Sequence, residues 1–345
     1  MTAFAAYRMP QTAECQLIIQ RDGDPETVSC LADLRGKSGF VVAPFSASAD
    51  CPMMVLRPDI IKTFSPSAPP RLEAMLADIA EPTESADEER RAYAQQFRLF
   101  HQQTANGIFR KIVLARQSVV SRPTRADEAI DLFAAACRRY PFMFVALVSA
   151  PACGTWLTAT PELLLGTTPR GLSTMALAGT MPWPQQTPPP TWSEKNQSEQ
   201  RLVQDFVAEK LRLARVHYII EGPQTVRAGH LAHLCTRFHV TPSDPSQPAD
   251  ILALLHPTPA VSGMPQASAR QFILDHERLP RRYYSGFAGP LALGGATSLY
   301  VNLRCMQIGR RACRLYAGGG LLADSQEQSE WDETAAKMQT MRQLL

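Results

Sequence analysis

The sequence predicts an α+β fold built from largely antiparallel sheets. Short β-branched and apolar segments follow one another in hairpin-like pairs, with Gly and Pro between them. Longer segments with helical spacing stand apart from these pairs. Runs of strands with separate helices are typical of α+β proteins. The 345 residues contain no long linker or low-complexity stretch, so we expect a single domain over residues 1–345.

The first part of the chain, residues 1–89, carries no chemical motif and is expected to be a divergent part of the scaffold. Its strands are predicted at 15–20, 39–44 and 53–56. Residues 63–86 are rich in Pro, Ser, Ala and Glu, which indicates loop and a short helix.

The rest of the chain, residues 90–345, alternates between helical and strand patterns. Helices are predicted at 87–106, 125–139 and 193–216 and at the end of the chain from 329. Strands are predicted at 111–116, 142–148, 155–165, 286–293, 298–307 and 314–317. The segment 182–192 holds five prolines and two tryptophans, which indicates a surface loop or, as the alternative, a polyproline ligand.

Composition excludes several classes of function. Hydrophobic residues make up 45% and charged residues 19% of the chain, as in ordinary globular proteins. A net charge of +3 is too small to indicate a nucleic-acid or anionic-membrane partner. The eight cysteines form no CxxC pair, and several of them, in apolar runs, are expected to be buried free thiols. Neither a signal peptide nor an apolar run of about 18 residues is present, so we expect a soluble, cytoplasmic protein.

The closing helix carries charge on its expected buried face. At 3.6 residues per turn, Glu330, Glu333 and Lys337 fall in one arc with Met341 and Leu344. Burying an unpaired charge costs several kcal/mol, roughly. Two carboxylates one turn apart suit a hard divalent cation. The alternative is a solvated face stabilised by charge pairs along the helix.

A third carboxylate lies on another face that is expected to be buried. Glu199 is flanked on its helix by Leu202 and Phe206. An arginine or a backbone amide usually satisfies such a carboxylate. Together with Glu330 and Glu333, it begins to resemble an oxygen-ligand site for Mg²⁺, which keeps several waters and uses substrate oxygens.

Two further residues have the chemistry of a base and an acid. Lys111 enters the strand 111–116, and a lysine near buried apolar residues can serve as a general base. Glu162 lies beside three leucines, where a carboxyl group can act as a general acid. The alternatives are a lysine that extends its ammonium to water and a solvent-exposed carboxylate at a strand end.

Two strings are unusual for a core. In 256–263, His-Pro-Thr-Pro-Ala-Val-Ser-Gly, two prolines fix φ and hold Ala260 and Ser262 in a set position. In 316–320, Tyr-Ala-Gly-Gly-Gly, a glycine-rich turn is predicted whose backbone amides can bind a carboxylate. No Gly-Lys-Ser/Thr follows, so this turn is not a Walker loop.

Together these strings resemble the chorismate-utilising enzymes, which include isochorismate, salicylate, anthranilate and aminodeoxychorismate synthases. The resemblance covers residues 90–345, and its motifs occur in the family's order. They are 111–116, 161–165, 177–180, 194–199, 256–263, Arg304, 316–320 and 330–337. The fold that the resemblance implies is that of anthranilate synthase component I, with two large antiparallel sheets packed together and helices outside. Asn196 departs from a common aspartate, and Met181 from a frequent arginine.

The resemblance also implies roles for particular residues. Glu199 and Glu333 resemble direct ligands of a Mg²⁺ ion that binds the ring carboxylate of chorismate, and Glu330 resembles a ligand acting through water. Lys111 resembles the general base that activates water for attack at C2. Glu162 resembles the general acid that protonates the leaving C4 hydroxyl. The residues implied in substrate binding are Thr180, His256, Ala260, Arg304, Tyr316, Gly318 and Lys337.

Within the family, Ala260 favours an isochorismate synthase. Relatives that use ammonia or eliminate pyruvate usually carry a threonine there, whereas alanine leaves room at the ring and holds no other nucleophile. The alternatives are a salicylate synthase and a catalytically silent chorismate- or metal-binding paralogue. The resemblance implies a product for menaquinone or catecholate-siderophore biosynthesis. We expect no glutaminase subunit, and a monomer.

Overall fold

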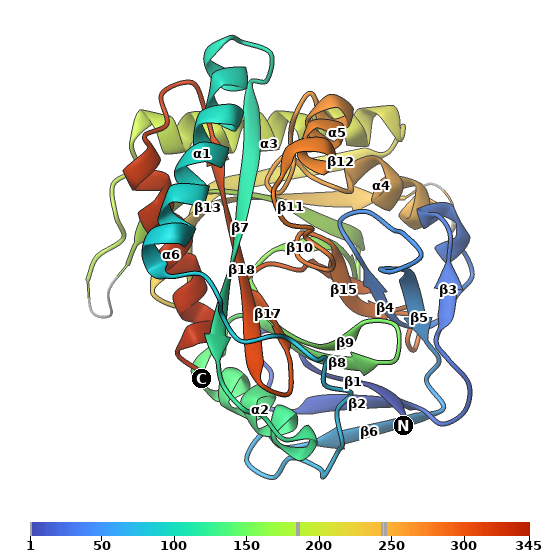
Figure 1. Ribbon diagram of the computed structural model, residues 1–345. Helices are drawn as coiled ribbons and strands as arrows, with labels where there is room; N and C mark the ends of the chain where they lie inside the picture. Colours follow the sequence, from blue (N-terminus) through green and yellow to red (C-terminus); the bar gives the residue numbers. More distant parts are fainter. Residues whose placement is uncertain (1, 184–186, 243, 245–246) are drawn as a thin grey trace.

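The computed structural model describes residues 2–183, 187–242, 244 and 247–345. In this part of the chain, two nine-stranded sheets pack together and helices lie on their outer sides (Figure 1). The strand pairings within both sheets are antiparallel. The predicted α+β class with two large antiparallel sheets is confirmed.

The first sheet contains the strand that begins with Lys111. In spatial order its strands are β14 (Gly263–Met264), β7 (Lys111–Ser121), β18 (Ala312–Leu321), β17 (Cys305–Ile308), β9 (Gly154–Thr160), β8 (Phe144–Ala150), β1 (Ala3–Arg8), β2 (Cys15–Gln20) and β6 (Ile60–Phe64). The ten-residue pairing of β7 with β18 brings the strand of Lys111 beside the glycines 318–320.

The second sheet contains the longest hairpin of the described chain. In spatial order its strands are β12 (His217–Ala228), β13 (Leu231–Thr241), β11 (Gly171–Pro182), β10 (Leu163–Thr168), β16 (Ser298–Val301), β15 (Phe287–Leu291), β4 (Gly39–Ala43), β5 (Met53–Leu56) and β3 (Glu26–Val28). Residues 1–64 supply strands to both sheets, so the N-terminal part of the scaffold is built into each of them.

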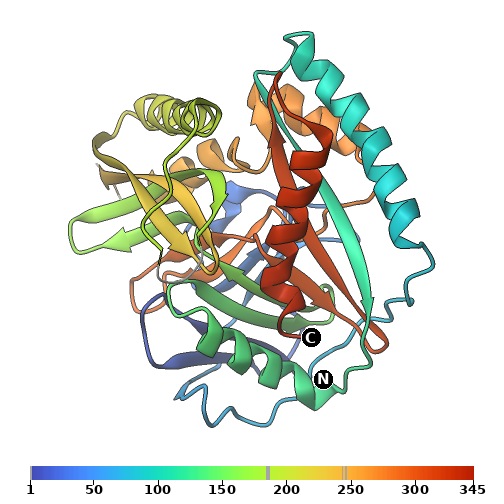
Figure 2. The same cartoon turned by 90° about the vertical axis from the view of Figure 1, so that its left-hand side faces the viewer.

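Helices cover the outer faces of the two sheets and carry several of the predicted site residues. They are α1 (Ala86–Ala105), α2 (Ala129–Arg139), α3 (Glu194–Leu213), α4 (Gln247–Leu255), α5 (Gln266–His276) and α6 (Glu327–Arg342), with short 3₁₀ helices at Leu31–Leu34 and Ala126–Glu128. Helices α1 and α6 lie against β7 and β18, while α3 lies against β11 of the other sheet (Figure 2). No helix in the described ranges is long and apolar enough to cross a membrane.

Local sequence explains where the site helices begin. The side chain of Ser85 accepts a hydrogen bond from the backbone N–H of Glu88, and the carboxylate of Glu88 accepts one from the backbone N–H of Ser85, so α1 starts with a capping box. Ser193 caps α3 by accepting from the backbone of Asn196. The Ser193 cap fixes the first turn of α3, and Glu199 lies in the next turn of this helix.

An aromatic core joins the two sheets. Phe144 of the first sheet stacks on Tyr300 of the second, with ring centroids 4.3 Å apart. Phe40 packs from the second sheet against Tyr7 of the first at 5.4 Å. Burial of such rings is a large favourable contribution to folding, and it holds the sheets in fixed relation around the site.

Several features differ from the sequence prediction. Helices α4 and α5 and strands β1 and β6 were not predicted, and the predicted strands 155–165 and 298–307 each divide into two strands of different sheets. The short helix expected within residues 63–86 is absent, because the chain between the end of β6 at Phe64 and the start of α1 at Ala86 contains no helix. The glycines 318–320 lie within β18 and not in a turn, because β7 pairs with the whole segment. The hairpin of β12 and β13 was not predicted. The proline-rich segment connects β11 to α3 as expected, although its residues 184–186 lie outside the described residues.

Candidate active site

A cavity of about 560 Å³ lies where strands of both sheets meet helices α3 and α6. It collects residues that are far apart in the sequence. The predicted site residues that line it are Lys111, Glu162, Thr180, Glu199, Ala260, Arg304, Gly318 and Lys337.

Lys111, the first residue of β7, is 1% exposed. Its Nζ lies 2.8 Å from Oε1 of Glu199 on α3. The alternative of a lysine that extends to water therefore does not hold. The ion pair joins β7 to α3 across the cavity and fixes the position of the amine.

Glu162 precedes β10 and is 2% exposed. Burial raises the pKa of its carboxyl group to about 8, against the opposing charges of Lys111, Arg304 and Lys337. The solvent-exposed alternative is thus excluded. At neutral pH the group is mainly protonated and is able to donate a proton inside the cavity.

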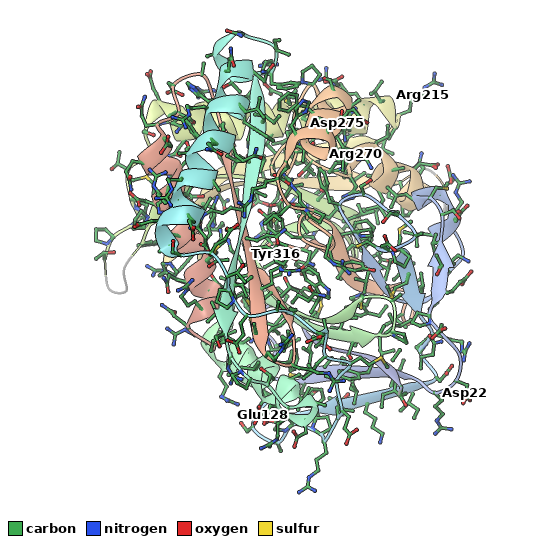
Figure 3. All side chains as sticks on the ribbon, viewed as in Figure 1. Asp22, Glu128, Arg215, Arg270, Asp275 and Tyr316 are labelled. Atoms are coloured by element: carbon green, nitrogen blue, oxygen red, sulfur yellow. The ribbon has the colours of Figure 1, made fainter. Side chains whose placement is uncertain are left out.

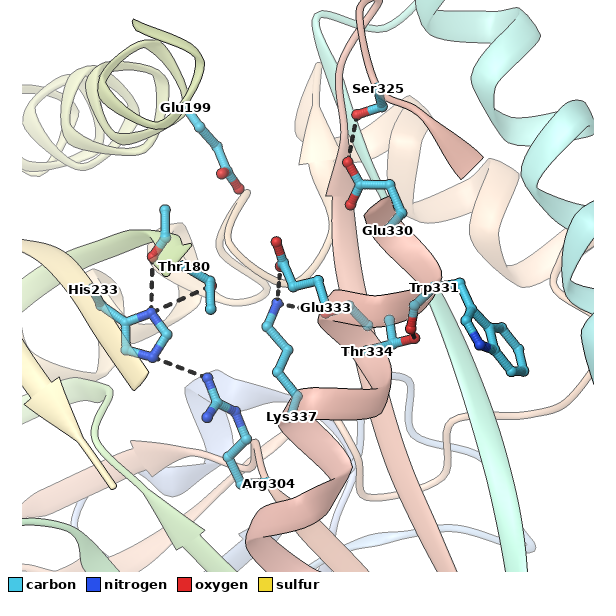
Figure 4. A network of polar contacts seen from close by, with 12 residues as sticks. Thr180, Glu199, His233, Arg304, Ser325, Glu330, Trp331, Glu333, Thr334 and Lys337 are labelled. Carbon is cyan, nitrogen blue, oxygen red and sulfur yellow. Dashed lines mark hydrogen bonds and ion pairs between the residues drawn. The ribbon is translucent and has the colours of Figure 1, made fainter. Parts of the chain in front are cut away.

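Three lysines pair with the three carboxylates expected to bind metal. Besides the Lys111–Glu199 pair, Nζ of Lys195 lies 2.8 Å from Oε1 of Glu330, and Nζ of Lys337 lies 2.5 Å from Oε1 of Glu333. Figure 4 shows Glu199 reaching from α3 toward Glu333 and Glu330 on α6. Glu330 is 2% exposed, so a solvated face for α6 is excluded.

The glycines of β18 allow these side chains to approach the backbone. A Cβ atom at Gly320 would lie 2.5 Å from Cε of Lys111 and 2.7 Å from Oε1 of Glu199. At Gly319 it would lie 2.8 Å from Oε2 of Glu330. The carbonyl oxygen of Gly318 accepts a hydrogen bond from Nζ of Lys337 at 2.9 Å. The glycines therefore make room for the charged groups.

Glu199, Glu330 and Glu333 offer the oxygen donors that a hard divalent cation prefers. Burial and then the neighbouring negative charge of Glu333 raise the pKa of Glu330, and a cation between such carboxylates would relieve this repulsion. In the described part of the chain, no three acidic, His or Cys side chains are grouped closely enough to hold a metal ion. Each of the three carboxylates is instead paired with an ammonium group.

His233 of β13 was missed in the sequence, where it is one polar residue in an apolar run. Its Nδ1 lies 2.8 Å from the carbonyl oxygen of Gly179, so Nδ1 carries the hydrogen. Nε2 then accepts a hydrogen bond from Nη2 of Arg304 at 3.0 Å. Burial and the charge of Arg304 hold the pKa of His233 well below 6.5. His233 is therefore a neutral support for Arg304.

Arg304 is left with capacity to bind an anion. Burial lowers its pKa to about 10, and its Nη1 is buried with no hydrogen-bond partner among the described residues. Thr180 lies on the other side of His233 from Arg304, with its Oγ1 3.4 Å from Nδ1 of His233 (Figure 4). A substrate carboxylate in the cavity would satisfy the free guanidinium nitrogen.

Two expected substrate-binding residues lie elsewhere. His256 packs edge-on against Phe287 and lines a separate cavity. Tyr316 lies in the interior of the molecule (Figure 3), where its ring packs against Trp156 and Tyr284. Neither lines the cavity of Lys111, because neighbouring aromatic rings hold both side chains aside; Tyr284 lines it instead.

Comparison with known proteins places this site in a family. Residues 56–345 match the model of the family described as chorismate binding enzyme. Isochorismate synthase DhbC of Bacillus subtilis (strain 168) is 33% identical over 252 residues, covering 69% of this chain and 63% of that protein. Isochorismate synthase MenF of Escherichia coli (strain K12) is 31% identical over 264 residues, covering 73% and 60%. The chain thus matches somewhat less than two thirds of the length of these relatives.

Solved structures support the fold. The menaquinone-specific isochorismate synthase MenF from Escherichia coli has a TM-score of 0.77 and 23% identity, covering 100% of this chain and 89% of that one. Anthranilate synthase component I from Streptococcus pneumoniae has a TM-score of 0.70 and 15% identity, covering 99% and 90%. These likenesses concern the fold, whereas the family match spans most of the sequence. The chain belongs to the chorismate-binding enzymes.

Proposed function

We propose that this protein is an isochorismate synthase, which converts chorismate to isochorismate. One observation carries the proposal: a buried amine and a largely protonated buried carboxyl group, Lys111 and Glu162, line the same cavity. A reaction that adds water at one ring carbon and removes hydroxide at another needs such a base and such an acid. The proposal includes use of the product for menaquinone or a catecholate siderophore.

In the proposed reaction, Lys111 first releases to solvent the proton with which it pairs with Glu199. The neutral amine then accepts a proton from a water molecule that attacks C2 of chorismate. Glu162 donates a proton to the C4 hydroxyl, which leaves as water while the ring double bonds shift. One water is consumed and one released, so the product is an isomer of the substrate. Arg304 and Lys337 hold substrate carboxylates, and Ala260 lines the cavity without adding a hydroxyl.

Magnesium is the proposed cofactor. Glu199, Glu330 and Glu333 would hold the ion, which supplies positive charge for the ring carboxylate of the substrate. Each of these carboxylates forms an ion pair with a lysine: Lys111, Lys195 or Lys337. The lysine side chains must therefore move away from the carboxylates when the ion binds.

The decisive experiment identifies the product. The purified protein is incubated with chorismate and Mg²⁺, and the products are separated by chromatography and identified by mass. We expect a species with the mass of chorismate and a different retention. Salicylate with pyruvate would establish the salicylate synthase alternative, and a lack of any product would favour the silent paralogue.

Replacing Glu333 by glutamine tests the metal site. The variant Glu333→Gln keeps the shape of the side chain and removes its charge, so we expect its apparent affinity for Mg²⁺ to fall by at least about 10-fold. The measurement is isochorismate formation as a function of Mg²⁺ concentration. Asp332→Asn, on the exposed side of the same helix, serves as the control. An unchanged magnesium response in Glu333→Gln would refute the ligand assignment.

Replacing His233 by methionine tests the support of Arg304. His233→Met keeps an apolar volume but removes the acceptor of Arg304, so we expect KM for chorismate to rise about 10-fold with a smaller change in kcat. Because His233 is neutral, the shape of the pH profile should stay the same. The control is His239→Met on the same strand, where the side chain is exposed. A new pH dependence would instead indicate proton transfer by His233.

A further inference from the structure

A second cavity, of about 520 Å³, opens at the edge of β7 between α1 and residues 278–281; we call it the edge cavity. Strand β14 pairs with β7 only at Lys111 and Ile112, so the edge of β7 is free of a strand neighbour further along. There Glu277 accepts the backbone N–H of Ala115 at 2.8 Å. Among the residues that the structure describes, none lines both the edge cavity and the candidate active site.

Two buried tyrosine side chains line the edge cavity, and the hydroxyl of one of them, Tyr93, has no hydrogen-bond partner among the described residues. Tyr93 of α1 is 4% exposed, and its hydroxyl forms no hydrogen bond within the described chain. The side chain of Tyr316 is 1% exposed, and its hydroxyl forms no hydrogen bond of normal geometry within the described chain. Burial raises the pKa of this hydroxyl, and the nearby guanidinium of Arg314 opposes that rise. Native proteins rarely leave buried hydroxyls unpaired, which points to a missing acceptor.

Arg116 supplies positive charge at the same place. Its guanidinium stacks 3.7 Å above the ring of Trp331, and its Nε donates to Oγ1 of Thr334 at 2.8 Å. The nearest carboxylate, Glu89, is 3.9 Å from Nη1, at the outer limit of an ion pair. Burial raises the pKa of Glu89 and lowers that of Arg116 to about 10, so an acceptor with full negative charge would stabilise this guanidinium.

The other residues that line the edge cavity indicate what kind of ligand, besides a carboxylate, it can hold. Ala92, Ala115 and Leu279 are apolar, and the rings of Tyr93 and Tyr316 offer flat surfaces. The other two arginines of the lining, Arg278 and Arg281, are already paired, with Glu84 at 2.7 Å and with Glu277 at 2.6 Å. Apart from the carboxyl group of Glu89, the open polar groups of the cavity are therefore hydroxyl donors beside the guanidinium of Arg116, on an apolar background.

We propose that the edge cavity is a regulatory site that binds a small cyclic carboxylate, with its carboxylate on Arg116 and Tyr93 and its ring among the apolar walls. The cavity touches β7 and β18, two of the strands that carry the active site. Arg116 connects it to α6 through its hydrogen bond to Thr334, one residue after Glu333, and Tyr316 lies two residues before Gly318 on β18. Binding that shifts Arg116 therefore changes the position of the metal-binding carboxylates.

The regulatory part of this inference rests on the proposed function, whereas the binding part does not. Isothermal titration calorimetry of the full chain with sodium salicylate measures binding without turnover. We expect saturable binding of salicylate and much weaker binding of salicylamide, which has the same ring and no charge. Equal affinity for both, or no binding at millimolar salicylate, overturns the proposal.

Substitutions in the lining of the edge cavity test whether salicylate binds there. Ala92→Leu fills the cavity and should abolish salicylate binding, while Ala94→Leu on the same helix, outside the cavity, should retain it. Tyr93→Phe removes only the hydroxyl and should weaken binding by about threefold to tenfold. Circular dichroism checks that each variant is folded. Unchanged affinity in both Ala92→Leu and Tyr93→Phe would mean that salicylate binds elsewhere and would overturn the assignment.

The same variants test regulation. In the wild type, salicylate should change KM or kcat for isochorismate formation, and this effect should disappear in Ala92→Leu. Calorimetric binding without an effect on an active enzyme would refute regulation alone. Calorimetric binding by a protein that forms no isochorismate would contradict the proposed function and leave the carboxylate site standing.

Discussion

Replacing Lys111 by methionine is expected to lower kcat for isochorismate formation by about 10²- to 10⁴-fold, the usual contribution of a proton-transfer group. Methionine matches the length of the buried lysine but accepts no proton. Lys111 lines the cavity and is fixed there by Glu199 at 2.8 Å. Steady-state kinetics with chorismate at saturating Mg²⁺ measures the loss, while binding of chorismate to the variant should remain detectable.

The control must separate loss of the base from loss of the fold. Lys111→Met leaves the Glu199 carboxylate without its partner, and burying an unpaired charge is costly. The double variant Lys111→Met with Glu199→Gln removes that charge and should regain thermal stability but no activity. Lys62→Met, at an exposed position on β6, should behave as wild type. Substantial turnover in the folded double variant would show that Lys111 is not the base.

The sequence was sufficient to predict elements whose patterns are local. The strand that begins at Lys111 and the helices α1 and α3 have apolar periodicity and capping residues of their own. The charged arc of the last helix was also informative, because Glu330 is buried with Met341 as its spacing predicted. The order of the motifs pointed to the family, and the family match confirms it.

Other features depend on contacts between distant segments and have no local signal. The glycines 318–320 have the composition of a turn, but ten residues of pairing with β7 hold them in a strand. His256 and Tyr316 carry suitable functional groups, yet packing against Phe287 and Tyr284 directs them away from the cavity. The neutral tautomer of His233 follows only from its two neighbours in space.

Replacing Glu162 by glutamine is expected to have an effect as large as loss of the base. Glu162→Gln keeps the shape and polarity of the side chain but cannot donate the proton, so we expect kcat to fall by about 10²- to 10⁴-fold. In the wild type, the pKa of about 8 predicts that activity falls as pH rises through this value, because the acid becomes ionised. Kinetics from pH 6 to pH 9, roughly the range around this pKa, should show that fall; its absence would refute the role of Glu162.

The same substitution predicts a change in stability that does not depend on catalysis. The pKa of Glu162 rises from 4.5 to about 8 on folding, so its stabilising contribution is complete below pH 4.5 and is lost as pH increases to 8. At about 1.4 kcal/mol per pH unit, this amounts to several kcal/mol, roughly. Glu162→Gln cannot ionise, so its free energy of unfolding in urea should fall less steeply over that range than that of the wild type. The control is Glu209→Gln, at an exposed position of α3, which should keep the steeper wild-type dependence of stability on pH. If the free energy of unfolding of Glu162→Gln fell with pH as steeply as that of the wild type, the Glu162 carboxyl group would be ionised at neutral pH and could not serve as the acid.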